Sequence, residues 1–262
     1  SEYYRFVLQA SYSTRDYCVQ FNETDLDFIH RLMAEAGVYY YFEHYAQKHT
    51  LVMADGPAGH GQIEEPNLRY QRRTGMVPGE SVIEQFDTLE RLRSGKASRR
   101  DYDFHKPSLA LHSEHAGDKP ELEIYNYPGG YQEQAQGDYL SQIQWESQQA
   151  ERSVASGRGN CRRLLPGYRF QLTNHPKESL NRGYLITGVV HEAEQPQVLE
   201  ETSGHQGSRY HNRLTAIPDH LPYRAAPKPK PKVPGVQIAV VTGPKGEEIY
   251  TNEYGQIKVQ FP

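Results

Sequence analysis

Twelve histidines in this 262-residue chain supply side chains that could bind a metal ion or transfer a proton. His44 and His49 are close in the sequence, as are His112 and His115. Neither pair has the i, i+4 spacing of a zinc-binding helix, and no Cys-x-x-Cys motif accompanies them. His30 falls among apolar residues of a helical pattern, which indicates a position at the edge of that helix. We therefore predict loop histidines, with no metal ion and no cofactor.

Carboxylates are abundant, but their spacing does not indicate a catalytic pair. Asp25 and Asp27 fall in the first turn of a predicted helix, where the peptide dipoles favour negative charge. Glu121 and Glu123 share one face of a predicted strand and would both face solvent. A glycosidase needs two carboxyl groups facing each other across a cleft, roughly 5 to 9 Å apart. No convergent acidic pair of that kind is evident.

Motifs for nucleophilic catalysis and phosphate binding are also missing. No Gly-x-Ser-x-Gly elbow is present, and neither Cys18 nor Cys161 lies in a catalytic signature. The glycine-containing residues 56–61 lack the spacing of a phosphate-binding loop and predict a turn. Two cysteines are too few for a disulfide scaffold, so we expect free thiols. The chain is predicted not to be an enzyme.

A helix followed by a hairpin is the unit around which the other elements are predicted to be arranged. Asn22 or Thr24 can cap the helix, and Gly37 ends it. The apolar stripe expected to form the helix core consists of Phe28, Ile29, Leu32, Met33 and Ala36. The aromatic run 38–42 pairs with residues 50–54 to form the hairpin. A lone hairpin is marginally stable, so the helix stripe is expected to cover it.

The rest of the chain is predicted to be mainly antiparallel strands with a second helix. The expected strands are residues 3–9, 17–21, 82–93, 97–105, 122–127, 168–173, 184–191 and 209–217. Residues 60–74 are predicted to be a loop, and residues 82–105 a long hairpin. The second helix is expected to start at Asp138, to include Val154 and to stop at Gly157. The fold class is therefore α+β, mainly β with two helices and antiparallel barrels.

The chain length suits two modest domains, although it also allows one. Residues 1–81 are expected to hold the end of a preceding barrel plus the helix-hairpin unit, and residues 82–217 a barrel with one helix. The proline-rich residues 218–235 predict a stiff linker. Residues 236–262 show only about three strands of a five-stranded oligonucleotide/oligosaccharide-type barrel, which indicates a truncated domain.

Charge and hydropathy exclude two classes of partner. The net charge is −4, so nothing global points to nucleic acid. The sequence contains no run of 18 or more apolar residues, so no transmembrane helix is predicted. The aromatic run of residues 39–45 is interpreted as part core and part subunit contact, where tyrosine is enriched. The alternative for this run is a stacking platform for a sugar, as in a carbohydrate-binding module.

Three stretches carry a resemblance to a known family. They read RDYCVQFNETDLDFIHRLMAEAGVYYYFEH, SGKASRRDYDFHKPS and VVTGPKGEEIYTNEYGQIKVQFP, in that order. The chain resembles the VgrG family, the trimeric spike proteins of the type VI secretion system, and the related baseplate-hub and tail-spike proteins of contractile phages. This sequence departs from the family pattern in two respects. The family's first barrel is expected before these stretches and its oligomer-forming shaft after them, and neither is evident in the sequence.

The resemblance implies a structural hub without catalysis that sits on the secretion tube and carries a membrane-piercing shaft. Its implied partners are two further copies, the tube protein Hcp, baseplate components, a tip protein and effectors, with membrane contact only by piercing. It implies assembly in the cytoplasm and secretion through the apparatus. Terminal residues without an evident partner in the chain are the predicted trimer contacts: Ile249, Tyr250, Tyr254, Ile257, Val259 and Phe261. The alternatives are a phage or tailocin hub or tail spike, and a peptidoglycan-hydrolysing tail enzyme.

Overall fold

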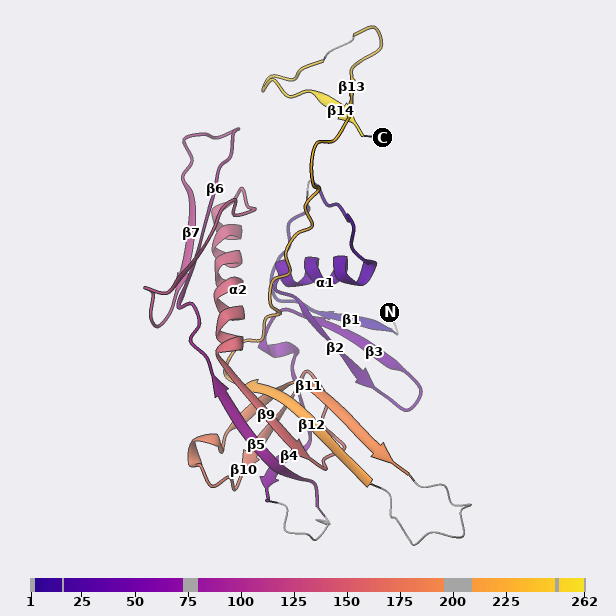
Figure 1. Ribbon diagram of the computed structural model, residues 1–262, viewed down its shortest axis with the longest axis vertical. Coiled ribbons are helices and arrows are strands. Elements are labelled where there is room, and N and C mark those ends of the chain that lie inside the picture. Colours follow the sequence, from indigo (N-terminus) through magenta and orange to yellow (C-terminus); the bar gives the residue numbers. More distant parts are fainter. Residues whose placement is uncertain (1–2, 16, 73–79, 196–208, 248–249, 262) are drawn as a thin grey trace.

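A closed six-stranded β-barrel dominates the computed structural model, which describes residues 3–15, 17–72, 80–195, 209–247 and 250–261 (Figure 1). Its strands are β4 (Gly61–Tyr70), β5 (Val82–Glu90), β9 (Ser153–Gly159), β10 (Tyr168–Thr173), β11 (Gly183–Glu194) and β12 (Arg209–Pro218). They follow the order β10-β11-β12-β9-β5-β4 around the barrel. Neighbours are antiparallel except at β4, which is parallel to both β5 and β10. The predicted fold class, mainly β with two helices, is confirmed.

Alternating side chains along the strands fill the barrel. Phe170 and Leu172 of β10, and Tyr184 and Ile186 of β11, are almost fully buried. The rings of Phe86 and Tyr184 pack edge to face, with their centres 4.8 Å apart. This two-residue period is typical of strands that turn one face toward a core.

The predicted helix and hairpin are both present. Helix α1 (Asp25–Glu35) begins after Thr24, whose hydroxyl oxygen accepts the Asp27 N–H at 3.1 Å. Strands β2 (Tyr39–His44) and β3 (His49–Ala54) form the hairpin, and β1 (Tyr4–Val7) pairs with β3 in parallel. A short 3-10 turn, η1 (Pro57–Gly59), follows. Residues 17–21 are predicted to be a strand, but the structure shows irregular chain there.

The apolar stripe of α1 is less buried than predicted. Half-buried members of the stripe are Phe28, Leu32, Met33 and Ala36. Ile29 is 50% exposed, so its assignment to the helix core is wrong in this chain. The buried helix positions are Arg31 and Ala34. The buried face of the hairpin packs on Tyr168 and Tyr223, whereas α1 contacts the opposite face, where His30 stacks on Tyr40.

Gly37 ends α1 in the left-handed region, with a φ of +70°. A Cβ at this position would lie 2.6 Å from Ile143 Cδ1 of the second helix. We expect Gly37→Ala to lower the free energy of unfolding by about 1–3 kcal/mol, because backbone conformation and packing both oppose the methyl group. Gly130→Ala is the matched control, since φ is +78° there and the added Cβ meets open space. Equal losses for the two variants in urea unfolding would contradict the packing argument.

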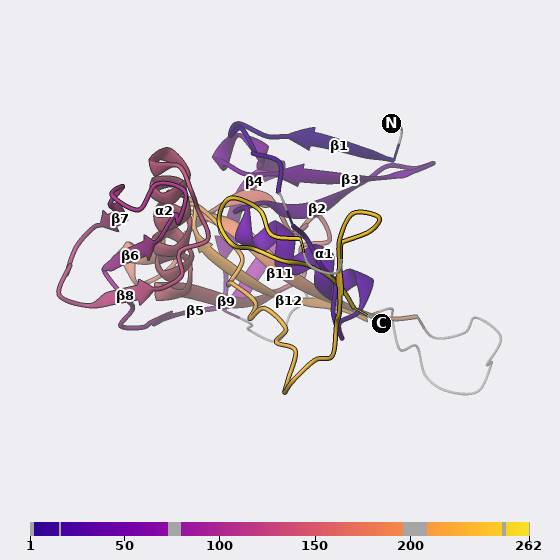
Figure 2. The ribbon, with the colours of Figure 1, turned by 90° about the horizontal axis from the view of Figure 1, so that it is seen from above.

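The second helix, α2 (Gln134–Arg152), packs on a three-stranded sheet made of β6 (Lys96–Asp101), β7 (Leu111–Ala116) and β8 (Glu123–Asn126). Figure 2 shows the helix beside β7 and β6. The predicted helix bounds are wrong, because Asp138 lies inside α2 and Val154 and Gly157 belong to β9. Small and polar side chains make up most of the buried helix face: Gly137, Ser141, Gln144, Glu146, Ser147, Gln149 and Ala150, together with Ile143. Such a face has little apolar periodicity.

Two further predictions differ from the structure. Residues 82–105 do not form one hairpin, because β5 pairs with β4 and β9 whereas β6 pairs with β7 and β8. Residues 61–70 are strand β4 and not a loop, because their few apolar residues, chiefly Ile63 and Leu68, all point inward. The predicted boundary after residue 81 therefore cuts through the barrel.

The chain leaves the barrel through proline-rich residues and ends in a small exposed sheet. A second 3-10 turn, η2 (Glu178–Leu180), connects barrel strands β10 and β11. Strands β13 (Val240–Thr242) and β14 (Lys258–Gln260) pair antiparallel beyond the connector, at the top of Figure 1. The third short strand expected within residues 236–262 includes residues 248–249, which lie outside the described residues, and Thr251 beyond them bridges to Ile257. Cys18 and Cys161 are free thiols, as predicted. Among the described helices, none combines the length and apolar character needed to cross a membrane.

Candidate functional site

The buried side chain of Arg224 joins three parts of the fold. Its Nε donates to Glu146 Oε2 of α2 at 2.6 Å. Its Nη1 donates to the carbonyl of Gly37 at 2.6 Å and to the carbonyl of Asp55. The Arg224 and Glu146 side chains are only 7% and 9% exposed, so two charges neutralise each other inside the protein. This junction links the chain that leaves the barrel to α2 and to the residues that directly precede and follow the hairpin.

The carboxylate of Asp55 holds the segment that follows β1. Its oxygens accept the N–H of Gln9, the N–H of Ala10 and the hydroxyl of Tyr12, each at 2.8 Å. Burial alone would raise the pKa of Asp55, but these hydrogen bonds and the nearby Arg224 hold it below its ordinary value. The carboxylate therefore stays ionised and fixes residues 9–12 against the hairpin.

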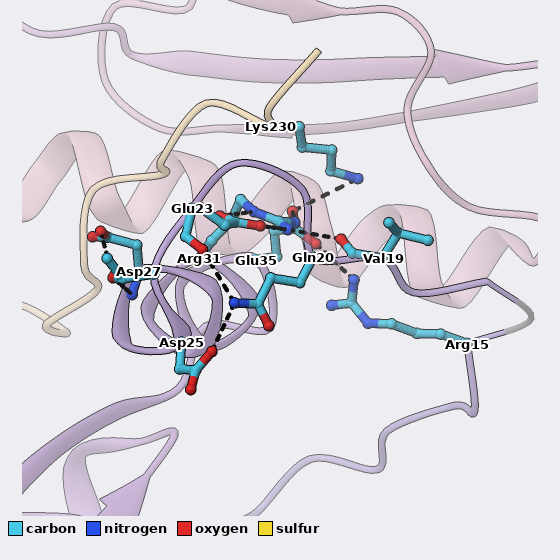
Figure 3. A network of polar contacts seen from close by, with 10 residues as sticks. Arg15, Val19, Gln20, Glu23, Asp25, Asp27, Arg31, Glu35 and Lys230 are labelled. Atoms are coloured by element: carbon cyan, nitrogen blue, oxygen red, sulfur yellow. Dashed lines mark hydrogen bonds and ion pairs between the residues drawn. The ribbon is translucent and has the colours of Figure 1, made fainter. Parts of the chain in front are cut away.

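A network around Arg31 holds the next segment on α1 (Figure 3). Arg31 Nη2 lies 2.5 Å from Glu23 Oε1 and 3.3 Å from the Val19 carbonyl oxygen. Arg15 Nη1 contacts Glu35 Oε2 at 2.7 Å. The hydrogen bond from Arg31 lowers the pKa of Glu23. Arg15 and the described residues 17–23 are therefore kept in place by ion pairs and hydrogen bonds to α1 and not by a β-ladder.

The basic connector binds the same helix. Lys228 Nζ lies 2.9 Å from Asp27 Oδ1, and Lys230 Nζ lies 3.6 Å from Glu35 Oε1. The hydrogen bond from Lys228 lowers the pKa of Asp27. Asp27 thus has a charge partner far away in the sequence in addition to its favourable position at the helix N-terminus. The connector is guided along α1 toward the terminal sheet.

The aromatic run of the hairpin divides between two faces. Tyr39 and Tyr41 are buried, and their hydroxyls donate to the carbonyls of Gly56 at 2.7 Å and Gly59 at 2.6 Å. The opposite face carries Tyr4, Phe6, Tyr40 and Phe42, which are 39% to 59% exposed. The core part of the interpretation is confirmed. The subunit contact remains a prediction for the exposed members of the run, Tyr40, Phe42 and Tyr45.

The described members of the predicted trimer contacts lie in the terminal sheet, in the chain between its two strands or directly after it. Exposed fractions between 39% and 57% are found for Tyr250, Tyr254, Ile257, Val259 and Phe261. Ile249 lies outside the described residues. Tyr254 has a partner within the chain, because its ring packs edge to face on Phe104 and His105 at 5.5 and 4.4 Å between centres. The expectation that these side chains lack partners is wrong for Tyr254.

The structure also brings together rings that the sequence analysis missed. An open groove of about 570 Å³ beside β6, β7 and β8 is lined by Arg100, Tyr102, Tyr125 and Tyr127 among others. Tyr125 and Tyr127 are two residues apart at β8, whereas Tyr102 follows β6, so only the pairing of these strands brings Tyr102 beside the other two rings. Among the described residues, no group of three or more His, Cys, Asp or Glu side chains could hold a metal ion.

Two relatives are similar to this chain over nearly its whole length. The type VI secretion system spike protein VgrG4b of Pseudomonas aeruginosa is 39% identical over 272 residues, covering 98% of this chain and 34% of that protein. The actin cross-linking toxin VgrG1 of Vibrio cholerae is 35% identical over 264 residues, covering 99% of this chain and 24% of the toxin. The chain thus spans about a third and a quarter of the length of these two relatives.

A solved structure and a family model define the fold. The E. coli c3393 protein, a component of the type VI secretion system with structural similarity to the T4 bacteriophage tail proteins gp27 and gp5, superposes with a TM-score of 0.64. That match covers 100% of this chain and 55% of the other at 20% sequence identity. The family model described as phage tail baseplate hub (GPD) matches residues 1–197. This chain therefore belongs to the phage tail baseplate hub (GPD) family.

Proposed function

We propose that this chain is the hub base of a type VI secretion spike, which joins the Hcp tube to the shaft and delivers effectors. The observation that carries the proposal is the 39% identity with a spike protein over nearly the whole chain. The buried Arg224 junction and the charge network on α1 support it, because they make one stiff body from distant segments. Such a body would assemble as a homotrimer in the cytoplasm with baseplate components and a tip protein, and contact membranes only by piercing.

Export of the tube protein tests this role. In the bacterium that encodes the chain, deletion of the codons for residues 1–262 is expected to abolish release of Hcp into the medium, and the wild-type gene should restore it. Unchanged Hcp release in the deletion strain would overturn the proposal. Loss of contractile tail particles in electron micrographs, with Hcp release intact, would favour the phage or tailocin hub instead.

We propose a structural and not a catalytic role for this region. It is shared by a relative named as a spike protein and by a relative named as a toxin, of which it covers only 24%. We therefore expect the toxin's activity to lie outside the shared part. Incubation of the purified chain with peptidoglycan should release no soluble fragments. Release that a single carboxylate-to-amide change abolishes would favour the hydrolase alternative.

A further inference from the structure

His44 and His49 lie directly opposite each other at the open end of the hairpin. Their Nδ1 atoms are 2.8 Å apart, whereas their ring centres are 4.9 Å apart. The two nitrogens therefore face each other, and both side chains are exposed. At this distance the Nδ1–H of one neutral ring donates to the unprotonated Nδ1 of the other, and a metal ion that displaces this proton would meet both nitrogens.

The separation of the two nitrogens allows both to bind one metal ion. Two ligand nitrogens about 2.0 Å from a metal ion are about 2.8 Å apart at a right angle and about 3.3 Å apart at the tetrahedral angle. Small rotations of the two exposed rings bring the Nδ1 atoms of His44 and His49 into this range, and imidazole ligands are typical of Cu(II), Ni(II) and Zn(II) sites. Cu(II) binds such ligands more tightly than Ni(II). We propose that His44 and His49 form a two-histidine site for Cu(II), independent of the proposed spike function.

The β-ladder fixes the position of both ligands. Neighbouring pairs hold the register, since Glu43 faces Thr50 and the Tyr45 N–H donates to the Lys48 carbonyl at 2.9 Å. Glu43 is engaged elsewhere, because it accepts from Arg5 at 2.5 Å and from the Tyr45 hydroxyl at 2.9 Å. Lys48 Nζ lies over the Tyr45 ring, 5.8 Å from its centre. A metal ion would replace the shared proton after small rotations of the two exposed rings, with water in its remaining positions.

The hairpin explains how two histidines that are five residues apart in the sequence come to lie side by side. A separation of five residues excludes a helical pair, but a tight hairpin places residues with this separation side by side on one face. Among the described residues, no third His, Cys, Asp or Glu joins these two. The proposed site therefore offers two protein ligands.

Copper titration of the untagged, chelator-treated full chain tests the proposal. Calorimetry with CuCl₂ should show one strongest site, and electron paramagnetic resonance should show hyperfine coupling to two imidazole nitrogens. His44→Gln and His49→Gln should each weaken that site at least about ten-fold, because even changes outside a ligand set commonly cost 10–100-fold. The double variant should weaken it no further, since either change already destroys the pair.

The matched control is His112→Gln, which removes an exposed strand histidine elsewhere on the surface. It should leave the strongest copper site unchanged. Circular dichroism and thermal unfolding without metal should match wild type for all variants, because each change is on the surface. Wild-type copper affinity in His44→Gln or in His49→Gln would overturn the proposal. The same loss in His112→Gln would also overturn it, since it would reveal non-specific binding.

Discussion

Arg224→Met is expected to lower the free energy of unfolding by about 3–5 kcal/mol, because it leaves the buried Glu146 carboxylate without its charge partner. The variant also removes the donors to two carbonyl groups, those of Gly37 and Asp55. Methionine keeps a similar length of apolar side chain, so the loss reports the polar contacts and not a cavity. Urea unfolding followed by circular dichroism measures the effect.

Two further variants separate the cost of the orphaned charge from a general effect of losing an arginine. Arg224→Met combined with Glu146→Leu should be more stable than Arg224→Met alone, since it leaves no buried unpaired charge. Arg213→Met breaks the exposed ion pair with Glu192 and should cost less than about 1 kcal/mol. Similar losses for Arg224→Met and Arg213→Met would show that the junction does not stabilise the fold.

Acidification is expected to destabilise the protein through His60. This ring is stacked on Tyr39 with centres 4.6 Å apart, and its Nδ1 donates to the Gly167 carbonyl at 3.2 Å. Burial, assisted by the charge of Arg169, lowers the pKa of His60 from 6.5 to about 4. The unfolded chain therefore binds a proton near pH 6.5, whereas the folded chain binds it only near pH 4. Stability from the neutral ring is complete above pH 6.5 and falls by up to about 3 kcal/mol as the pH approaches 4.

His60→Phe isolates this contribution, because the ring still stacks on Tyr39 but does not titrate. The difference in unfolding free energy between wild type and variant should change in favour of the variant between pH 7 and pH 4.5. Urea unfolding at several pH values gives this difference directly. Parallel stability curves for wild type and His60→Phe over that range would show that the His60 ring does not contribute to the acid sensitivity.

Local patterns in the sequence predicted the elements whose side chains alternate or repeat clearly. Strand β10 has the predicted bounds, and the hairpin follows the alternation of Tyr39 to Phe42. Strand β4 and helix α2 were misjudged because their buried faces are short of large apolar residues. Ser141, for example, is buried in α2 and hydrogen-bonded to Ser113 at 2.7 Å, a contact that no hydrophobic period reveals.

The candidate site depends on contacts between distant residues, which no spacing rule can predict. Arg224 contacts Gly37 across 187 positions and Glu146 across 78. Its position among prolines indicates a linker, so its role as a buried anchor becomes visible only when the fold brings its partners together. The pairing of His44 with His49 is local, but it required the hairpin register. The trimer contacts in the terminal sheet remain a prediction.

The mass of the purified chain in solution tests the central claim, that this protein completes its exposed sheets against further copies of itself. Light scattering at several concentrations is expected to give three times the chain mass of 30.0 kDa. Replacing exposed Ile257 and Phe261 of the terminal sheet with serine should shift that mass toward the monomer. A mass of 30.0 kDa for the unaltered chain at every concentration would contradict the claim.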